Sequence, residues 1–222
     1  MNQIISIIIL LAGILSAQTN QTDPKINDIE LLYNETGLDT LISRDLFNLS
    51  IYGYNRLLEN ASIPNTSKLT IIDFSKASTE ERFFVIDIDS RKLLFASHVA
   101  HGKNSGRQYA KNFSNMPGSL KSSLGFYITS NTYYGKHGYS LRLKGLESSF
   151  NGNAENRAIV MHAANYVSEK FIKDYGRLGR SWGCPALPKA ISKQVIDKIK
   201  DGTCLFIFAN DDKYLQSSPL LQ

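Results

Sequence analysis

One cysteine of this chain stands in a setting that suits a nucleophile. Cys184 follows Ser181, Trp182 and Gly183, and Pro185 comes next. Because Gly183 lets the backbone bend, successive N–H groups of the loop 181–184 can point at one spot, as an oxyanion hole requires. A thiol with a pKa near about 8.5 is a weak nucleophile until a neighbouring base takes its proton. The loop therefore predicts acyl transfer through a cysteine, provided that a base lies beside it.

His162 offers that base. It ends the apolar run 158–161, which is typical of a short strand. Histidine is the commonest general base because its pKa lies near neutrality. His162 and Cys184 are 22 residues apart, and a helix and loops between them would let the chain return beside the strand. The alternative, a buried cysteine and a surface histidine with no chemical role, stays open at this stage.

Polar and aromatic residues near these two are candidates for binding a substrate. Arg180 adjoins the cysteine loop, and a guanidinium binds carboxylates in a bidentate manner. His101, next to a glycine at a strand end, is expected to line the pocket or to hydrogen-bond there. Tyr133, Tyr134 and Trp182 are candidates for a pocket wall, although aromatic residues at such spacings more often belong to the core. Three further arginines are expected to be solvated surface charges: Arg142, Arg157 and Arg177.

A histidine-based zinc site is the competing chemistry. His98, His101 and His162 would make a conceivable ligand set for a metallopeptidase. On a strand, however, His98 and His101 would face opposite sides of the sheet, because side chains alternate. We therefore predict no metal and no organic cofactor, and keep zinc as the minor alternative.

The elements that must position these residues are mainly strands. Alternating and apolar runs predict strands over residues 69–74, 83–87, 93–100, 125–130, 139–143, 158–162 and 204–209. Helical signals cover residues 168–175 and 188–200, and an amphipathic helix begins after Ser43 with Phe47, Ile51, Tyr54 and Leu58 on one face. The predicted fold is a mainly β sandwich or barrel with flanking helices, preceded by this N-terminal amphipathic helix.

The first residues predict export. Residues 4–17 form an apolar run of 14 residues that closes on Ala17, which is typical of a secretory signal peptide over residues 1–17. A membrane-spanning helix needs about 20 residues, so an uncleaved anchor is the second choice. Residues 18–36 are polar and predict a tether, and residues 37–215 are expected to form the functional domain. We therefore expect an exported protein, periplasmic or associated with the cell envelope, without a stable membrane span.

The net charge indicates which classes of polymer could bind the protein, and the cysteine content bears on disulfide formation. The net charge of +5 suits an anionic polymer such as the cell wall, although solubility alone is an equally good reason. No basic run interleaved with aromatics indicates a nucleic-acid groove. In an oxidising compartment Cys184 and Cys204 could form a disulfide. Cys204 lies in the apolar run 203–209, however, which favours a free, buried thiol.

Six motifs together match one known family over about residues 40–210. They are Val99-Ala100-His101-Gly102, Phe113-Ser114-Asn115, Ser122-Ser123-Leu124-Gly125-Phe126-Tyr127, Gly135-Lys136-His137-Gly138-Tyr139-Ser140-Leu141, Arg157-Ala158-Ile159-Val160-Met161-His162, and Gly179 to Ala186. The chain thereby resembles the YkuD-type L,D-transpeptidases of bacterial peptidoglycan, more closely the murein L,D-transpeptidase catalytic domain family proteins. It departs from the usual family pattern with Ala163 after the histidine and Trp182 before Gly183.

The resemblance implies roles for the residues around Cys184 and His162. Cys184 would be the nucleophile and His162 its base, oriented by a backbone carbonyl near Ala163. The oxyanion hole would come from N–H groups at Trp182, Gly183 and Cys184. The implied reaction is cleavage of a tetrapeptide stem with release of D-Ala, followed by a 3→3 cross-link. An L,D-carboxypeptidase or another wall hydrolase with the same pair, and a non-catalytic wall-binding module, remain alternatives. The sequence indicates no oligomeric state.

Overall fold

The computed structural model describes residues 24–222. The predicted signal peptide, residues 1–17, and the first part of the predicted tether lie outside the described residues. Within residues 24–222, no helix is both long and apolar enough to cross a bilayer.

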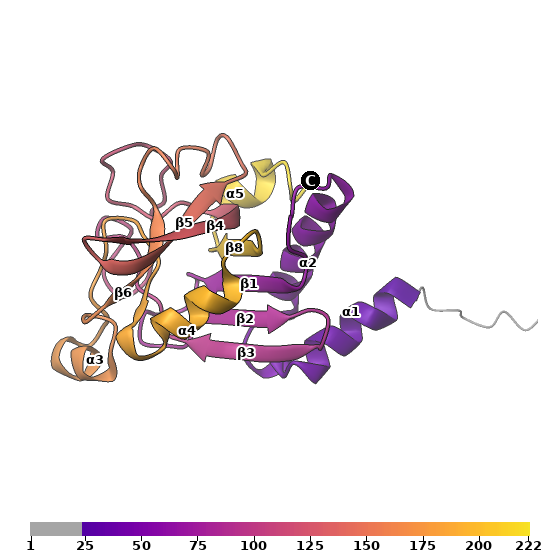
Figure 1. Ribbon diagram of the computed structural model, residues 1–222, viewed down its shortest axis with the longest axis horizontal. Helices are drawn as coiled ribbons and strands as arrows, with labels where there is room; N and C mark the ends of the chain where they lie inside the picture. Colours follow the sequence, from indigo (N-terminus) through magenta and orange to yellow (C-terminus); the bar gives the residue numbers. More distant parts are fainter. Residues whose placement is uncertain (1–23) are drawn as a thin grey trace, which may run out of the picture.

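A single mixed sheet of eight strands carries the fold, in the order β3-β2-β1-β8-β4-β5-β6-β7. In chain order the strands are β1 (Lys68–Asp73), β2 (Phe83–Asp87), β3 (Lys92–Ser97), β4 (Gly125–Gly135), β5 (Gly138–Gly145), β6 (Val160–Ala164), β7 (Ala186–Pro188) and β8 (Cys204–Phe208). The helices are α1 (Pro24–Glu35), α2 (Arg44–Glu59), α3 (Glu169–Tyr175), α4 (Lys189–Ile199) and α5 (Asp212–Ser217), with a 3-10 helix η1 (Leu38–Thr40). Figure 1 shows β1, β2 and β3 below β8, with β4, β5 and β6 above and to the side.

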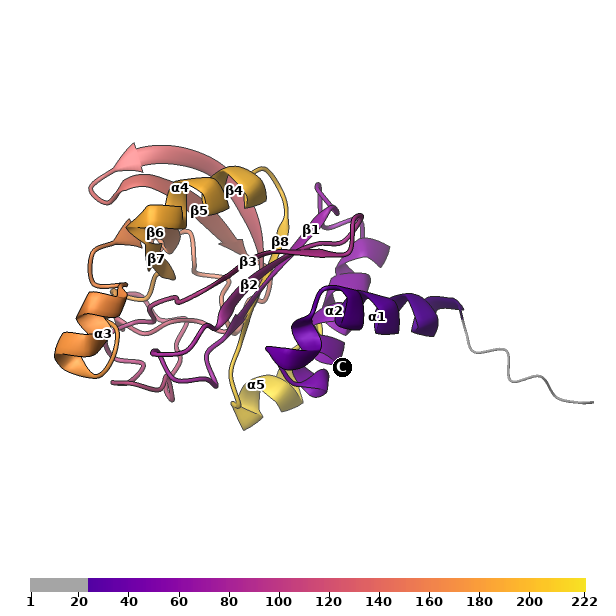
Figure 2. The same ribbon diagram turned by 90° about the horizontal axis from the view of Figure 1, so that it is seen from below.

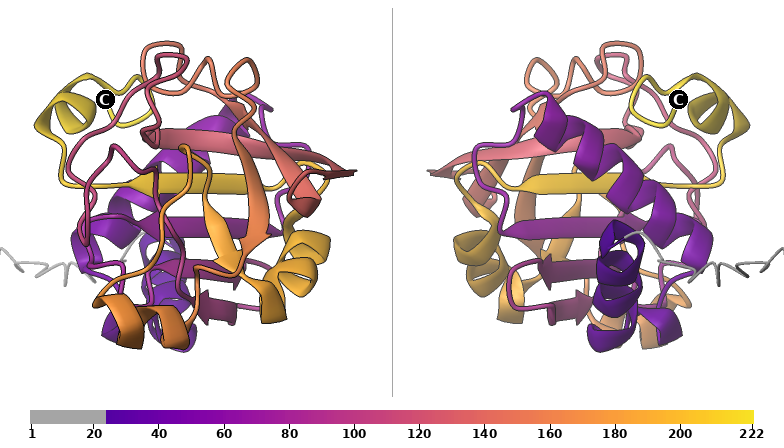
Figure 3. Two further views of the ribbon diagram at one scale, coloured as in Figure 1. Left: turned by 90° about the vertical axis from the view of Figure 1, so that its left-hand side faces the viewer. Right: turned by 90° about the vertical axis from the view of Figure 1, so that its right-hand side faces the viewer.

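The sheet curls until its two ends nearly meet. The chain that leaves β3 forms a bridge from Ala100 to Ala186 of β7, and a second bridge joins Gly102 to Ser181. The left view of Figure 3 faces this end of the barrel, with β6 and β7 in front and α3 and α4 on either side. The predicted fold class, mainly β with flanking helices in a sandwich or barrel, is confirmed. The loop before Cys184 therefore lies at the seam where the barrel closes.

The core is organised around β8. Each of its five residues is buried, and the strand pairs in parallel with β1 and antiparallel with β4. A strand covered on both faces reads as a continuous apolar run rather than an alternating one, as residues 204–208 do. Phe206 stacks on Phe126 of β4 with ring centroids 4.1 Å apart. This packing fixes the middle of the sheet.

The amphipathic helix predicted after Ser43 is α2. The hydroxyl of Ser43 accepts the N–H of Leu46 at 3.2 Å, which caps the first turn. Phe47, Ile51 and Tyr54 are buried, as expected. Leu57 is buried in place of the expected Leu58, which is exposed, so the apolar face is rotated slightly at its end. Figures 1 and 2 show α1 and α2 at the opposite end of the molecule from β6 and α3.

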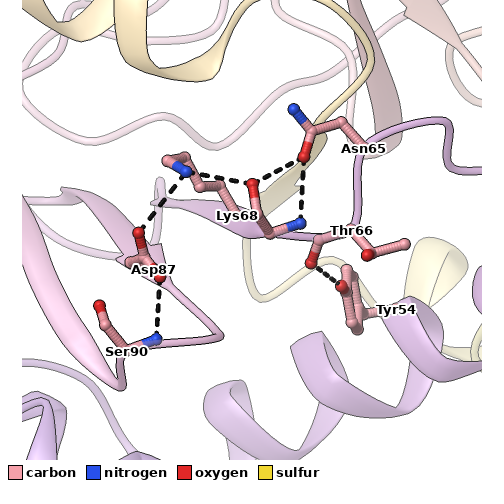
Figure 4. Close-up of polar contacts among 7 residues, drawn as sticks. Tyr54, Asn65, Thr66, Lys68, Asp87 and Ser90 are labelled. Carbon is pink, nitrogen blue, oxygen red and sulfur yellow. Dashed lines mark hydrogen bonds and ion pairs between the residues drawn. The ribbon is translucent and has the colours of Figure 1, made fainter.

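Polar contacts fix α2 and the neighbouring turns to the sheet (Figure 4). The hydroxyl of Tyr54 donates to the carbonyl of Thr66 at 2.5 Å, just before β1 begins. Lys68 on β1 lies 3.5 Å from the carboxylate of Asp87 on β2, which also accepts the N–H of Ser90 in the following turn. This face of the molecule is structural and far from the barrel seam.

Three elements differ from the predictions. The tether expected over residues 18–36 contains α1 from Pro24 onward, and Leu32 and Tyr33 of this helix are buried. The short strand β7 and the terminal helix α5 were not predicted. Strand β7 has only three residues, too few to show a period. Helix α5 is held by a tertiary contact, since the buried carboxylate of Glu147 accepts the hydroxyls of Tyr214 and Ser218.

Candidate active site

A cavity of about 450 Å³ opens at the barrel seam. Its walls come from the β4–β5 hairpin, β6 and the residues just before it, Tyr166 between β6 and α3, and the loop that precedes β7. The lining residues are Tyr133, Lys136, His137, Arg157, Ala158, Val160, His162, Tyr166, Arg180, Ser181, Trp182 and Cys184. Cys184 and His162, which the sequence placed far apart, thus face the same cavity.

The thiol of Cys184 is held against the start of β6. Its Sγ lies 3.5 Å from the N–H of Val160, which donates to it, and 3.7 Å from the carbonyl oxygen of Ala158. The cysteine is half-buried, and it forms no disulfide. Ala158 has a φ of 51°, in the left-handed region that costs an alanine energy. Such strain persists only where surrounding contacts over-determine the backbone, and here it directs a carbonyl at the sulfur.

The imidazole of His162 is oriented by its own strand. Nδ1 lies 2.9 Å from the carbonyl oxygen of Ala163. A carbonyl oxygen can only accept, so Nδ1 carries the hydrogen and Nε2 keeps its lone pair. Backbone pairing holds His162 between Ser140 of β5 on one side and Ala186 of β7 on the other. The ring is thereby ready to accept a proton at Nε2.

The pair is neutral at rest. Burial lowers the pKa of His162 below its ordinary 6.5, and the nearby His137 lowers it further, against the effect of the Ala163 carbonyl. Burial raises the pKa of the Cys184 thiol above its ordinary 9.0, although the Val160 N–H and the Arg157 guanidinium oppose this. At pH 7 the site therefore holds a thiol and an uncharged imidazole. Among the described residues no hydrogen bond joins the two side chains.

Ser181 braces the nucleophile loop from within. Its hydroxyl accepts the N–H of Gly183 at 3.0 Å and donates to the carbonyl of Cys184 at 2.6 Å. Gly183 therefore does not present the free N–H that the resemblance implied. Across residues 24–222, the N–H groups of Trp182 and Cys184 donate to no protein acceptor. These two N–H groups are therefore available to a bound ligand.

Gly183 is where the loop needs a glycine. Its φ is +126°, a conformation that side chains rarely adopt. A β-carbon there would lie 2.8 Å from the carbonyl oxygen of Lys121 and 3.1 Å from Ile159. The hydroxyl of Ser122 donates to the Gly183 carbonyl at 3.2 Å and accepts the N–H of Gly102 at 3.0 Å. The loop is thus clamped between β6 and the segment 102–122.

The family model of the L,D-transpeptidase catalytic domain matches residues 39–208, which is most of the chain. The chain belongs to the L,D-transpeptidase catalytic domain family. This match includes both the cavity and the strands that build it. No curated protein sequence matches the chain.

Solved structures of L,D-transpeptidases are also similar to this domain. One from Mycobacterium smegmatis is 13% identical, with 65% of this chain and 60% of that chain covered and a TM-score of 0.41. One from Stackebrandtia nassauensis is 14% identical, with 83% and 77% covered and a TM-score of 0.39. The helical cell shape determining protein Pgp2 of Campylobacter jejuni, as a K307A mutant, is 13% identical, with 77% and 58% covered and a TM-score of 0.43. This chain spans about 60% of the first of these structures.

His101, predicted to bind substrate, is buried in this L,D-transpeptidase domain and does not line the cavity. Its Nδ1 lies 2.8 Å from the guanidinium of Arg82, and its Nε2 lies 3.3 Å from the Gly106 carbonyl. Because Arg82 can only donate, Nδ1 accepts and Nε2 carries the hydrogen. Burial and the Arg82 charge lower the pKa of His101 to about 3, so the ring stays neutral. Its carbonyl accepts the N–H of Ser181 at 3.0 Å, which supports the nucleophile loop from behind.

Of the other residues predicted to lie at the pocket, some line the cavity and one does not. Arg180 and Trp182 line the cavity, and Trp182 is 74% exposed at its rim. Tyr134 does not line it: this ring is 79% exposed and packs on Tyr139, while its neighbour Tyr133 faces the site. Alternation along β4 explains why only one of the two tyrosines lines the cavity, because successive side chains point to opposite faces of a strand.

The sequence analysis did not assign several lining residues to the site, among them His137, Tyr166 and Arg157. His137, in the turn between β4 and β5, stacks on His162 with ring centroids 4.4 Å apart. Tyr166 follows β6, and burial raises the pKa of its hydroxyl to about 12. Arg157, expected as a surface charge, donates to Ser114, Ser119, Ser123 and Lys121 and so ties the loop 114–123 to the site. The motifs around His137 and Arg157 were visible in the sequence, but nothing local indicated that they face Cys184.

The geometry also bears on the zinc alternative. His98 contacts the carbonyl of Thr79 and the carboxylate of Glu169, while both nitrogens of His101 are engaged elsewhere. Within residues 24–222, no group of three or more His, Cys, Asp or Glu side chains is placed to hold a metal ion. Cys204 is fully buried in β8 and unpaired.

Proposed function

We propose that this protein is an exported cysteine L,D-transpeptidase that acts on the tetrapeptide stems of peptidoglycan. The observation that carries the proposal is the shared cavity of Cys184 and His162, in which Nδ1 of the imidazole is fixed on the Ala163 carbonyl at 2.9 Å. This arrangement presents a thiol and a proton acceptor to one bound carbonyl group.

The first half-reaction forms a thioester. Nε2 of His162 takes the thiol proton, and the Cys184 sulfur attacks the carbonyl carbon of the diamino acid at its L-centre. The N–H groups of Trp182 and Cys184 stabilise the oxyanion that develops. Each such donor lowers the activation free energy by roughly 3–4 kcal/mol. When the tetrahedral intermediate collapses, the C–N bond breaks and the imidazolium protonates the departing amine. D-Ala leaves, and the remaining tripeptide is bound to the sulfur.

The second half-reaction transfers the acyl group. The side-chain amine of a neighbouring stem attacks the thioester carbon and gives a proton to His162. The C–S bond then breaks, the sulfur regains its proton, and a 3→3 cross-link results. If water attacks instead, the same acyl-enzyme gives an L,D-carboxypeptidase. The chemistry of the first half is identical in both cases.

Mass spectrometry of the purified protein incubated with tetrapeptide muropeptides tests the proposal. We expect an adduct on Cys184 with the mass of the stem without its terminal D-Ala. Adding an acceptor stem should convert the adduct into a cross-linked dimer, whereas appearance of a free tripeptide alone would indicate the carboxypeptidase. A metal chelator should leave turnover unchanged, because the proposed reaction needs no metal ion. Loss of activity on chelation would favour the zinc peptidase.

The alternative of a wall-binding module makes a different prediction. A Cys184→Ala variant of such a module would bind muropeptides as the wild type does, and the wild type would form no adduct and release no D-Ala. Adduct formation that requires Cys184 would exclude the binding module.

Export to the periplasm or cell envelope is part of the proposal and is supported by the apolar run 4–17 and its small-residue end. Expression of the full chain in a bacterial host, followed by fractionation and N-terminal sequencing, tests it. Cleavage after Ala17 and recovery outside the cytoplasm are expected. An intact N-terminus in the membrane fraction would favour an uncleaved anchor.

A further inference from the structure

A second cavity of about 290 Å³ adjoins the catalytic one. It is lined by Lys103, Tyr166, Phe171, Arg177, Gly179 and Arg180. Tyr166 and Arg180 line both cavities, so the two are neighbours with a shared wall. A ligand anchored in the second cavity would have its remaining part close to Cys184.

Three of the six lining residues are cations, and their charges are not neutralised. Burial lowers the pKa of Arg180, and the guanidinium groups of Arg177 and Arg107 lower it further. Among the described residues, the side chains of Lys103, Arg177 and Arg180 form no salt bridge. Positive groups that repel one another gain from an anion placed between them.

Acidic side chains on the adjacent helix α3 have other partners. Asp174 lies 2.7 Å from Lys170, one turn earlier in the same helix. Glu169 lies 3.5 Å from His98 on the opposite side. The charge of this cavity, which we call the cationic cavity, is therefore left for a ligand.

The cationic cavity is built on the nucleophile loop. Arg180 donates to the carbonyl of Lys103 at 3.1 Å and to that of Gly106 at 2.9 Å, which ties its two walls together. The N–H of Lys103 donates to the carbonyl of Ser181 at 2.7 Å. Gly179 lets the loop approach Tyr166, since a β-carbon there would lie 2.3 Å from this side chain. The walls are fixed to Ser181, three residues from the sulfur.

We propose that the cationic cavity is a subsite that binds the carboxylate at the second residue of a stem peptide while another part of the stem lies at Cys184. The inference rests on the function proposed above. Guanidinium and ammonium groups bind carboxylates through charge-assisted hydrogen bonds, and the rings of Tyr166 and Phe171 give the ligand an apolar wall. The carboxylate belongs either to the donor stem, which acylates Cys184, or to the acceptor stem, which resolves the thioester.

A double variant, Lys103→Gln with Arg177→Gln, tests the subsite. It leaves Arg180 and its loop contacts in place, and the one polar contact of Arg177 that it removes is a 2.7 Å donation to the neighbouring Leu178 carbonyl. Lys173→Gln is the matched control, because Lys173 is an exposed residue of α3 that does not line the cavity. Thermal unfolding checks that all three proteins are folded.

Each protein is assayed with two sets of stems that differ in one group, a free carboxylate or its amide at the second residue. For the wild type and the control we expect the carboxylate stem to have the lower KM. In the double variant KM for the carboxylate stem should rise about tenfold, and KM for the amide stem should change far less. A rise confined to the donor stem assigns the carboxylate to the donor, and a rise confined to the acceptor assigns it to the acceptor. Equal changes for the carboxylate and amide stems, or no change, would overturn the subsite.

Direct binding separates this inference from the proposed function. Calorimetric titration of the same stems into each protein reports affinity whether or not an acyl-enzyme forms. If no adduct forms on Cys184 but the double variant still loses affinity for the carboxylate stem alone, the subsite stands and the transpeptidase reaction falls. If the adduct forms at wild-type rate from saturating stems and affinity is unchanged, the reaction stands and the subsite falls.

Discussion

Two regions of the barrel each hold one cysteine, and their surroundings are opposite. Cys204 begins β8 in the middle of the sheet, is fully buried, and has a pKa raised by burial alone. Cys184 lies at the seam beside β7, is half-buried, and has backbone groups of β6 around its sulfur at 3.5 and 3.7 Å. The central region stabilises the fold through regular packing. At the seam, a left-handed Ala158 and a Gly183 at φ +126° shape the backbone for chemistry.

The comparison shows that the place of a cysteine in the barrel decides whether its thiol can reach a ligand. In β8, paired strands on both sides satisfy the backbone, and an apolar neighbourhood leaves the sulfur no route to a substrate. At the seam, pairing stops at short bridges, and N–H groups of Trp182 and Cys184 are left for a ligand. Substitutions that act differently on the two regions test this contrast.

Removing each sulfur should give the largest divergence. For Cys184→Ala we expect turnover to fall on the order of 10⁴-fold or more, because the nucleophile is lost. For Cys204→Ala we expect near-normal turnover and a loss of about 1 kcal/mol in the free energy of unfolding, because a small cavity opens in the core. D-Ala release and denaturant unfolding measure the two effects. Comparable losses of turnover in both variants would remove the contrast.

Replacing the base should have the next largest effect. His162→Asn is expected to lower kcat/KM by about 10²–10⁴-fold, since an amide cannot take the thiol proton. Binding of a stem peptide should be retained, because the ring is not proposed to hold the substrate. Steady-state kinetics and calorimetry check the two parts. Retention of more than a tenth of the wild-type kcat/KM would assign the base to another group.

The nucleophile loop can be disturbed without changing a reactive atom. Gly183→Ala places a β-carbon 2.8 Å from the Lys121 carbonyl at φ +126°, so the loop must shift. A misplacement of about 1 Å near a reacting atom can cost roughly 10²-fold in rate, and we expect a loss of that size. Gly37→Ala is the control, since its φ is +72°, nothing lies within 4 Å of the added carbon, and it is in the N-terminal region.

The control variant should lose about 1 kcal/mol of stability from left-handed strain and keep its turnover. The free energy of unfolding and kcat are measured for both proteins. If Gly183→Ala keeps wild-type kcat, the loop geometry is not critical for the reaction.

Local patterns in the sequence predicted the strands, the main helices, and Cys184 and His162 as candidate reactive residues. The apolar run ending in His162 and the small residues around Cys184 are each legible within a few residues. The features that the sequence did not predict depend on contacts between residues far apart in the chain. Arg82 follows two glutamates in what reads as an exposed turn, yet it is fully buried, with its guanidinium on the Val99 carbonyl and on His101.

The same reason explains the other misses. His101 is next to the seam, but the alternation of strand residues could not show that both its nitrogens are occupied from inside the barrel. His137 is in a hairpin turn, where a histidine is normally solvated, and it meets His162 only because β4 and β5 extend past the seam. Closure of the barrel joins Ala100 and Ala186, which are 86 residues apart, and no short window of sequence contains both.

The smallest predicted effect concerns this imidazole stack. Burial is the main cause that lowers the pKa of the His162 ring; the Ala163 carbonyl raises this pKa, and the nearby His137 lowers it further. Replacing His137 with Gln removes the lowering effect, so the pKa of His162 should rise. His162 must be neutral to accept the thiol proton, and the acid limb of the kcat/KM profile should therefore move to higher pH, by less than about one unit. At pH 6 the variant should be slower than the wild type, and above pH 8 the two should be equal.

His137→Phe separates charge from stacking, because it keeps a flat ring at the 4.4 Å contact and removes the titratable nitrogens. If the charge of His137 is responsible, the Phe and Gln variants should shift the acid limb alike. A shift in the Gln variant alone would assign the effect to the stacked ring and the water that its loss admits. An acid limb that moves to lower pH in both would contradict the electrostatic account, because a neighbouring positive charge can only make protonation of His162 harder.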